Sequence, residues 1–200
     1  MAAGSRDSIS RILAFVSVGL GAIALLLACV GVGTPGWQTT YSTTGGSTQV
    51  TSYNNFFYGC TGLGSNMTCY NRNASFTGYG LSGFYFSSTF SAANDTSARF
   101  QSAAGLSIVG IIFIAAGTIA TLVMALLALY TWFNLIPPAL LFLACLFMLA
   151  ALAEGSRVLL YNDYAANLYQ TAHLLTILSF GLSALAAGRF HFERMYTDKV

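Results

Sequence analysis

The stretch that decides the fold is residues 37–72, WQTTYSTTGGSTQVTSYNNFFYGCTGLGSNMTCYNR, in which Arg72 is the one charged residue. Residues 38–44 and 47–53 are rich in β-branched side chains and flank Gly45-Gly46. Two such runs around a glycine pair are typical of a β-hairpin. The sequence therefore predicts a small sheet that begins close behind Trp37.

Two cysteines, Cys60 and Cys69, lie later in the same polar stretch. The eight residues between them include two glycines and several other turn formers, so the chain can fold back there and bring the sulfurs together. A pair in a polar loop predicts a disulfide and an oxidising compartment. The staple would hold a second hairpin, with strands at residues 56–60 and 69–72. Cys29 and Cys145 lie in apolar runs and are predicted to be buried thiols.

Composition places this polar stretch in a membrane protein. The 200 residues are 56% hydrophobic and only 7% charged, whereas soluble domains carry about 25% charged residues. The net charge of +2 is small and scattered along the chain, which excludes nucleic acid as the expected partner. The lipid bilayer is the first partner that the composition indicates.

Four uncharged runs predict a four-helix transmembrane bundle, since a helix needs about 20 apolar residues to cross the hydrocarbon core. The first run is too long for a signal-peptide core of about 7–15 residues, so it is expected to stay as a span. A cap at Asn94-Asp95-Thr96 would start the second helix. Arg157 to Tyr161 is a further candidate strand. The predicted spans are 12–32, 103–130, 135–153 and 171–187, joined by outer loops at 34–101 and 154–170 and followed by a tail at 188–200.

Orientation follows from two patterns on opposite sides of the predicted spans. Basic residues flank the side that holds both termini, and the positive-inside rule assigns that side to the cytoplasm. Three Asn-x-Ser/Thr acceptors all fall in the first loop and predict glycosylation outside the cell. We therefore expect a multi-pass plasma-membrane protein with both termini cytoplasmic. The basic residues are Arg6, Arg11, Arg189, Arg194 and Lys199, and the acceptors are Asn66, Asn73 and Asn94.

With four spans, a large first loop, Trp37 and the pair Cys60 and Cys69, the chain resembles the claudin superfamily, which includes claudins, myelin-type proteins and stargazin-type channel subunits. The family shows Gly-Leu-Trp where this chain has Asn55-Phe56-Phe57, and Phe57 stands at the matching distance before Cys60. Arg99 resembles the family arginine before the second helix. The resemblance implies a left-handed bundle under a five-strand extracellular sheet, with four strands from the first loop and one from the second.

Catalytic and metal-binding chemistry is not expected. None of the acidic residues stands inside a predicted span, and no three or four ligands converge in the sequence on a metal site. We therefore expect no enzyme, no cofactor and no transport site in the monomer. Glu154 and Arg157 stand one helical turn apart, either as an anchoring ion pair or as a contact to a partner subunit.

Two sets of residues are candidate partner surfaces. Phe84, Tyr85 and Phe86 belong to an aromatic segment that either packs under the sheet and at the headgroup level or anchors a partner protein. Gly117, Thr121 and Ala125 recur at helical spacing and form a close-packing face. That face serves either packing within the bundle or lateral association with another membrane protein.

Two functions fit this sequence. The claudin resemblance implies a cell-contact or membrane-organising protein whose outer sheet assembles with copies of itself in cis and trans. The stargazin resemblance implies an auxiliary subunit beside a channel or receptor. The few charges of the first loop do not make the line of like charges that an ion-selective pore needs. The terminal Val200 is a candidate ligand for a scaffold domain that binds carboxylates.

Overall fold

The computed structural model describes residues 8–44, 46–63, 66–71, 91–127 and 131–197. The chain divides into two compact units, which are described one at a time below. The first consists of Met1–Cys29, Ile108–Leu149 and Gln170–Val200, and the second of Val30–Ser107 and Ala150–Tyr169.

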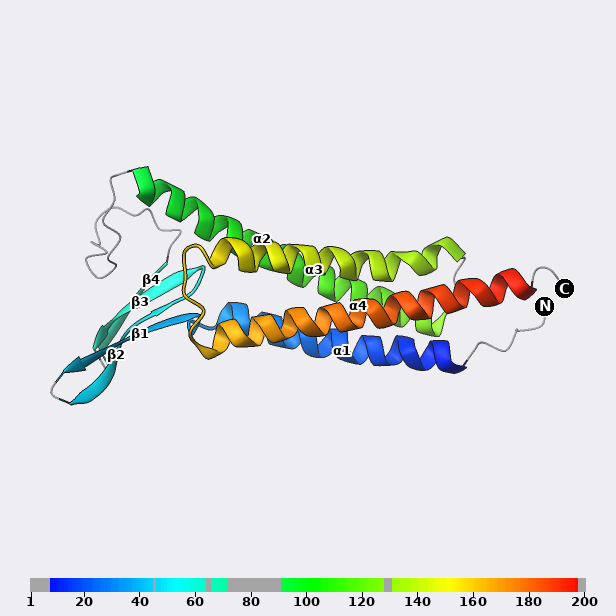
Figure 1. Cartoon of the computed structure of the whole chain (residues 1–200), viewed down its shortest axis with the longest axis horizontal. Helices are drawn as coiled ribbons and strands as arrows, with labels where there is room; N and C mark the ends of the chain where they lie inside the picture. The colour runs from blue at the N-terminus through cyan, green and yellow to red at the C-terminus, as the bar shows by residue number, and fades with distance from the viewer. Residues whose placement is uncertain (1–7, 45, 64–65, 72–90, 128–130, 198–200) are drawn as a thin grey trace. The chain divides into compact units, whose positions relative to one another are not determined.

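Four helices are long and apolar enough to cross a membrane, as the sequence predicts. They are α1 (Ser8–Gly33), α2 (Ser91–Leu126), α3 (Ile136–Gly155) and α4 (Tyr164–Thr197), with a short 3₁₀ helix, Thr131–Leu135, between α2 and α3. In the first unit the four helices run side by side, with the start of α1 and the end of α4 at the same end (Figure 1).

Each helix extends beyond its predicted span at one end or both, but α2 ends at Leu126, short of the predicted residue 130. α2 begins at Ser91, so the cap predicted at Asn94-Asp95-Thr96 is wrong. α4 begins at Tyr164 and takes in residues assigned to the second outer loop. Ala165, Ala166 and Tyr169 are fully buried there, and burial of these side chains supports the extra helical turns. Only residues 156–163 connect α3 to α4.

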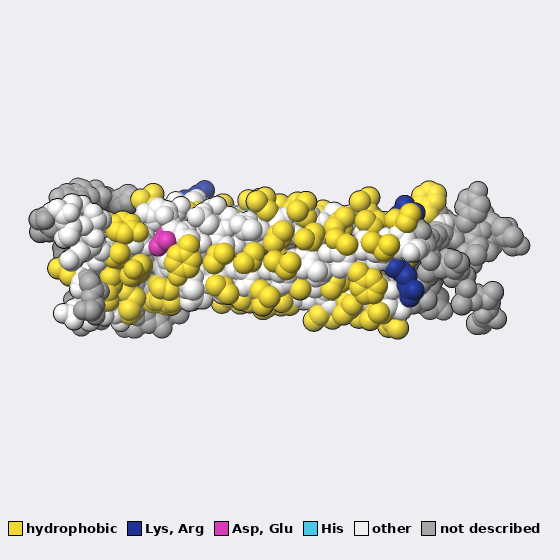
Figure 2. Space-filling model, turned by 90° about the horizontal axis from the view of Figure 1, so that it is seen from below, with side chains coloured by type: hydrophobic (Ala, Val, Ile, Leu, Met, Phe, Trp, Pro, Cys, Tyr) yellow, Lys and Arg dark blue, Asp and Glu magenta, His cyan; other side chains and the backbone are white. Residues whose placement is uncertain are grey.

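Alanine is the commonest buried hydrophobic residue of the first unit, and many of its large apolar side chains are exposed. Its buried positions include Ala14, Ala24, Leu141, Ala144 and Ala186. On the face drawn in Figure 2, hydrophobic side chains lie along its helices, and Lys and Arg side chains lie at one end of the unit. A small-residue core lets helix backbones approach closely, and an apolar exterior is suited to lipid. The exposed set includes Ile12, Phe15, Ile23, Leu26, Ile112, Ile119, Leu146, Leu149, Leu174, Leu178 and Leu185.

Buried hydroxyls join the helices of this unit. Ser17 Oγ donates to the Ser179 carbonyl oxygen at 2.8 Å, and Ser179 Oγ donates to the Ser17 carbonyl oxygen at 2.8 Å. This reciprocal pair links α1 to α4. Thr121 and Ser183, whose hydroxyl oxygens lie 3.2 Å apart, link α2 to α4. Hydrogen bonds of this kind favour helix association where no water competes for the hydroxyls.

The second unit carries a four-stranded antiparallel sheet in the order β1-β2-β3-β4. The first hairpin is confirmed, with β1 at Gln38–Thr44 and β2 at Ser47–Asn54. Gly46 has a φ of +80°, a conformation that glycine adopts without steric cost. Strands β3 (Tyr58–Leu63) and β4 (Asn66–Asn71) continue past the cysteines, so the turn is tighter than the predicted loop.

The fifth strand that the resemblance implies is not formed between Arg157 and Tyr161. The backbone N–H groups of Val158 and Leu159 both donate to the Gly155 carbonyl oxygen, at 3.0 and 2.9 Å. The chain therefore continues as a turn from the end of α3, and its N–H groups are used there instead of at the sheet.

Candidate functional site

Trp37 is the centre of the second unit and is completely buried. Its ring lies 4.3 Å from Phe56, 5.3 Å from Tyr161 and 5.4 Å from Tyr169, measured between ring centroids. Tilted and edge-on contacts at these distances are favourable for aromatic rings. The cluster joins the start of the sheet to the α3–α4 connection and to the first turns of α4.

Phe56, and not Phe57, provides the ring that contacts Trp37. Phe56 is 2% exposed, whereas Phe57 is half-buried and its backbone N–H donates to Asn55 Oδ1. The role expected of Phe57 therefore belongs to the preceding residue. Spacing to Cys60 does not fix which ring points inward, because the turn before β3 changes the alternation of the strand.

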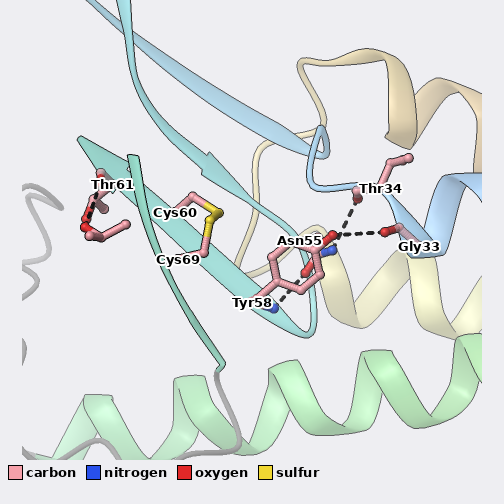
Figure 3. Close-up of a disulfide and its surroundings, with 8 residues drawn as sticks. Gly33, Thr34, Asn55, Tyr58, Cys60, Thr61 and Cys69 are labelled. Atoms are coloured by element: carbon pink, nitrogen blue, oxygen red, sulfur yellow. Dashed lines mark hydrogen bonds between the residues drawn. A yellow bond between two sulfur atoms is a disulfide. The ribbon is translucent and has the colours of Figure 1, made fainter. Parts of the chain in front are cut away.

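Side chains near the base of the sheet bind the carbonyl oxygens at the end of α1. The Trp37 indole Nε1 donates to the Gly31 oxygen at 2.6 Å. The Tyr58 hydroxyl donates to the Gly33 oxygen at 2.9 Å, and Asn55 Nδ2 donates to the Thr34 oxygen at 3.2 Å (Figure 3). The last carbonyls of a helix lack partners within the helix. These three donors fix the sheet to that helix end.

Asn55 also builds the turn between β2 and β3. Its Oδ1 accepts hydrogen bonds from the backbone N–H groups of Phe57 and Tyr58, both at 2.8 Å. An asparagine side chain that binds the backbone two and three residues ahead stabilises a turn. One side chain thus closes the turn and attaches it to Thr34, the residue that follows α1.

The Cys60–Cys69 disulfide is present, as predicted. The two residues are direct partners in the register of β3 and β4, so the disulfide links two directly opposed residues of the hairpin (Figure 3). Cys29 and Cys145 are free. Cys145 is half-buried, but Cys29 is exposed on α1. The expectation that both thiols are buried is therefore wrong for Cys29, and Cys145 is buried only in part.

The α3–α4 connection attaches to the sheet through two neighbouring side chains. Thr39 N–H donates to Asn162 Oδ1 at 3.0 Å, and Asn162 Nδ2 donates to the Thr39 carbonyl oxygen at 3.0 Å. The Thr39 hydroxyl donates to Asp163. Nearby, the Tyr161 hydroxyl donates to the Leu152 oxygen at 2.7 Å. Burial raises the pKa of Tyr161, so this phenol stays neutral.

Glu154 pairs with two arginines. Arg99 on α2 lies 3.1 Å from one carboxylate oxygen, and Arg157 lies 3.8 Å from the other. The ion pair that spacing allows between Glu154 and Arg157 is therefore present, and Arg99 makes a shorter contact that spacing in the sequence does not indicate. Arg99 and Glu154 side chains are about one-third exposed, at 30% and 32%.

Gly117, Thr121 and Ala125 are all buried in the first unit. A side chain at Gly117 would meet Leu141 of α3, and Ala125 packs with Ala14, Met124, Ala186, Ala187 and Phe190. These contacts fit the packing role that the sequence left open. A face that is covered within the bundle does not offer a lateral surface.

Several predicted residues lie outside the described part. These residues are Phe84, Tyr85, Phe86 and Asn73. Asn94 lies on α2, but its side chain is also outside the described part. Asn66 is exposed on β4. Within the described residues no group of three His, Cys, Asp or Glu side chains is placed to hold a metal ion.

Sequence analysis missed four residues of this site: Asn55, Tyr58, Tyr161 and Asn162. The pair Asn54-Asn55 ahead of two phenylalanines is a turn signal and indicates the turn. No local pattern indicates the contacts of Asn162 with a strand more than a hundred residues away. No family model matches the chain, and no curated protein matches it.

Proposed function

We propose that this chain is a claudin-like, non-enzymatic membrane protein of the plasma membrane, with both termini in the cytoplasm and its sheet outside the cell. It acts through protein–protein contacts of the sheet, in cell–cell contact or membrane organisation. Support comes from four apolar helices and a stapled antiparallel sheet whose base is tied to the end of α1.

One observation carries this proposal: the sheet is anchored at its base and bare at its far end. Trp37, Gln38 and Thr39 are buried, whereas Tyr41 and Leu63 are 60% and 62% exposed. No residue of β1 or β2 is charged. A fixed sheet that presents neutral hydroxyls and a few large apolar side chains is suited to docking against another protein surface.

The test is the distribution of the tagged chain in cultured cells that make no junctional strands of their own. Expressing and non-expressing cells are mixed, and the protein is measured at contacts of each kind. We expect enrichment where two expressing cells meet and none where an expressing cell meets a non-expressing cell. A uniform distribution, together with stoichiometric co-purification of a channel or receptor, would overturn the proposal in favour of an auxiliary subunit.

A further inference from the structure

The outer edge of β1 is open over its second half. β1 pairs with β2 on one side, and on the other side Asn162 occupies the position at Thr39. Beyond Thr39, no described residue pairs with the outer side of Tyr41 or Thr43. Among the described residues, the outward backbone groups in the last part of β1 thus have no strand partner.

The register shows which groups point outward. The register places Thr44 opposite Ser47 and Ser42 opposite Gln49. In a hairpin with two residues between its strands, the pair next to the turn is hydrogen-bonded and such pairs alternate along the strands, which assigns these two pairs as hydrogen-bonded. Tyr41 and Thr43 therefore direct their N–H and C=O groups away from β2. The register shifts between Thr40 and Tyr41, where β2 has the extra residue Thr51, so the alternation of β1 itself continues. Thr39 has the same parity as Tyr41, and its N–H and C=O do point outward, to Asn162.

The two edge strands are both free of charged residues and proline, and they differ in one sequence feature, the glycosylation acceptor of β4. β4 carries the acceptor Asn66-Met67-Thr68 on its strand, and a glycan on the exposed Asn66 would obstruct that edge. β1 has no glycosylation acceptor, no charged residue and no proline. Charged residues, especially lysine, and proline are among the features that natural proteins use to block pairing at a sheet edge. With Asn66 glycosylated, β1 would be the more accessible of the two edges formed by the described residues.

We propose that the β1 edge pairs with β1 of a second copy of this chain, antiparallel and about a twofold axis at Ser42. Tyr41 of each copy then stands opposite Thr43 of the other, which allows four backbone hydrogen bonds. A neutral strand brings no charge repulsion between identical copies. This inference rests on the proposed function, because it names the partner of the sheet as the chain itself.

A pairing this short is weak for one pair of molecules. Confinement to a membrane raises the effective concentration of neighbours, and many weak contacts add in an array. Short edge pairing therefore suits a protein that assembles laterally or across a cell contact and that dissociates as a soluble fragment.

Cysteine crosslinking on intact cells tests the pairing. Ser42→Cys places two thiols opposite each other at the axis, in a background with Cys29→Ala and Cys145→Ala. The matched control is Gln49→Cys, which is the direct partner of Ser42 on β2 and equally close to the hairpin end. It lies one strand farther from the axis, so its thiol is too distant to bond with its copy. We expect an oxidant-dependent dimer for Ser42→Cys and none for Gln49→Cys.

A second variant tests the backbone. Thr43→Pro removes an outward N–H without removing a hydrogen bond inside the hairpin. Added to Ser42→Cys, it is expected to abolish the dimer at unchanged surface level and with the native disulfide intact. If the Thr43→Pro protein does not reach the cell surface, Thr43→Lys replaces it in the test. Thr43→Lys places a charge at the β1 edge of each copy and is expected to abolish the dimer in the same way.

The outcomes separate this inference from the proposed function. Enrichment at contacts of wild type without a Ser42→Cys dimer overturns the β1 pairing and leaves the proposed function standing. A Ser42→Cys dimer without enrichment keeps the pairing and overturns the contact function. Equal dimer yields from Ser42→Cys and Gln49→Cys, or a dimer that survives both Thr43 variants, would show random collision and overturn the pairing.

Discussion

The side-chain amide of Asn162 pairs with the backbone of Thr39 in both directions, with two hydrogen bonds of 3.0 Å. It occupies the place on the β1 edge that one residue of a fifth strand would take. Together with the Thr39–Asp163 hydrogen bond and the backbone bond from Asn162 N–H to the Trp37 oxygen, this amide attaches the α3–α4 connection to the start of β1. It also leaves the rest of that edge unpaired by any described residue, which is the surface on which the further inference rests.

Asn162→Ala should destabilise the protein by about 1–2 kcal/mol, because both Thr39 backbone groups lose their partner. Asn162→Asp should cost more, since it keeps an acceptor, loses the donor and places a charge against the Thr39 carbonyl. Thermal unfolding of detergent-purified protein measures both. Leu160→Ala, at a neighbouring residue that is 67% exposed, is the control. Equal melting temperatures for Asn162→Ala and wild type would show that the two hydrogen bonds between Asn162 and Thr39 add no stability.

Trp37→Phe should cost about 1–2 kcal/mol by removing the donor to Gly31, and Trp37→Ala about 3–5 kcal/mol by leaving a cavity. Trp132 is 82% exposed, so Trp132→Phe is the control and should leave stability unchanged. The chain has only two tryptophans, and each single variant leaves one reporter. Blue-shifted emission is expected from Trp37 in the Trp132→Phe protein, and emission like that of free indole in water would contradict its burial.

Cys60→Ser and Cys69→Ser should each lower the surface level of the protein. The disulfide closes a short loop and is expected to stabilise the hairpin by about 2–3 kcal/mol in the chain-entropy model. Surface biotinylation measures the level, and Cys29→Ser, at a free cysteine, is the control. Labelling of both thiols on intact cells without reductant would refute the pairing in the mature protein.

Glycan attachment is expected on at least one of Asn66, Asn73 and Asn94. Replacing all three with glutamine should abolish a mobility shift that a glycosidase removes. Thr68→Ala tests Asn66 alone, because it destroys the acceptor without changing the asparagine. A surface-expressed wild type with no glycosidase-sensitive shift would contradict the proposed orientation.

Removing the ion pair between Arg99 and Glu154 should cost at most about 1 kcal/mol, since both side chains are about one-third exposed and water screens the pair. A double-mutant cycle with Arg99→Gln and Glu154→Gln isolates the coupling. The same cycle with Arg157→Gln should give a smaller value, because that contact is longer and Arg157 is 61% exposed. Equal couplings would show that the two arginines are interchangeable.

Local pattern alone determined much of this fold. Uncharged runs of sufficient length predicted four helices, β-branched runs around Gly45-Gly46 predicted the first hairpin, and turn-rich spacing predicted the pairing of Cys60 with Cys69. Each of these features depends on hydrophobicity, backbone preference or chain reversal over neighbouring residues. The sequence carries that information wherever the segment is placed.

The tertiary structure decided what depends on distant neighbours. It selected Phe56 over Phe57 as the partner of Trp37, joined Arg99 to Glu154, and replaced a fifth strand with the side chain of Asn162. It also covered Gly117 and left Cys29 exposed. In each case the candidates are chemically similar along the chain. The alternative residues differ in which side chains are buried and in which backbone groups already have hydrogen-bond partners. Packing between segments that are remote in the sequence decides both.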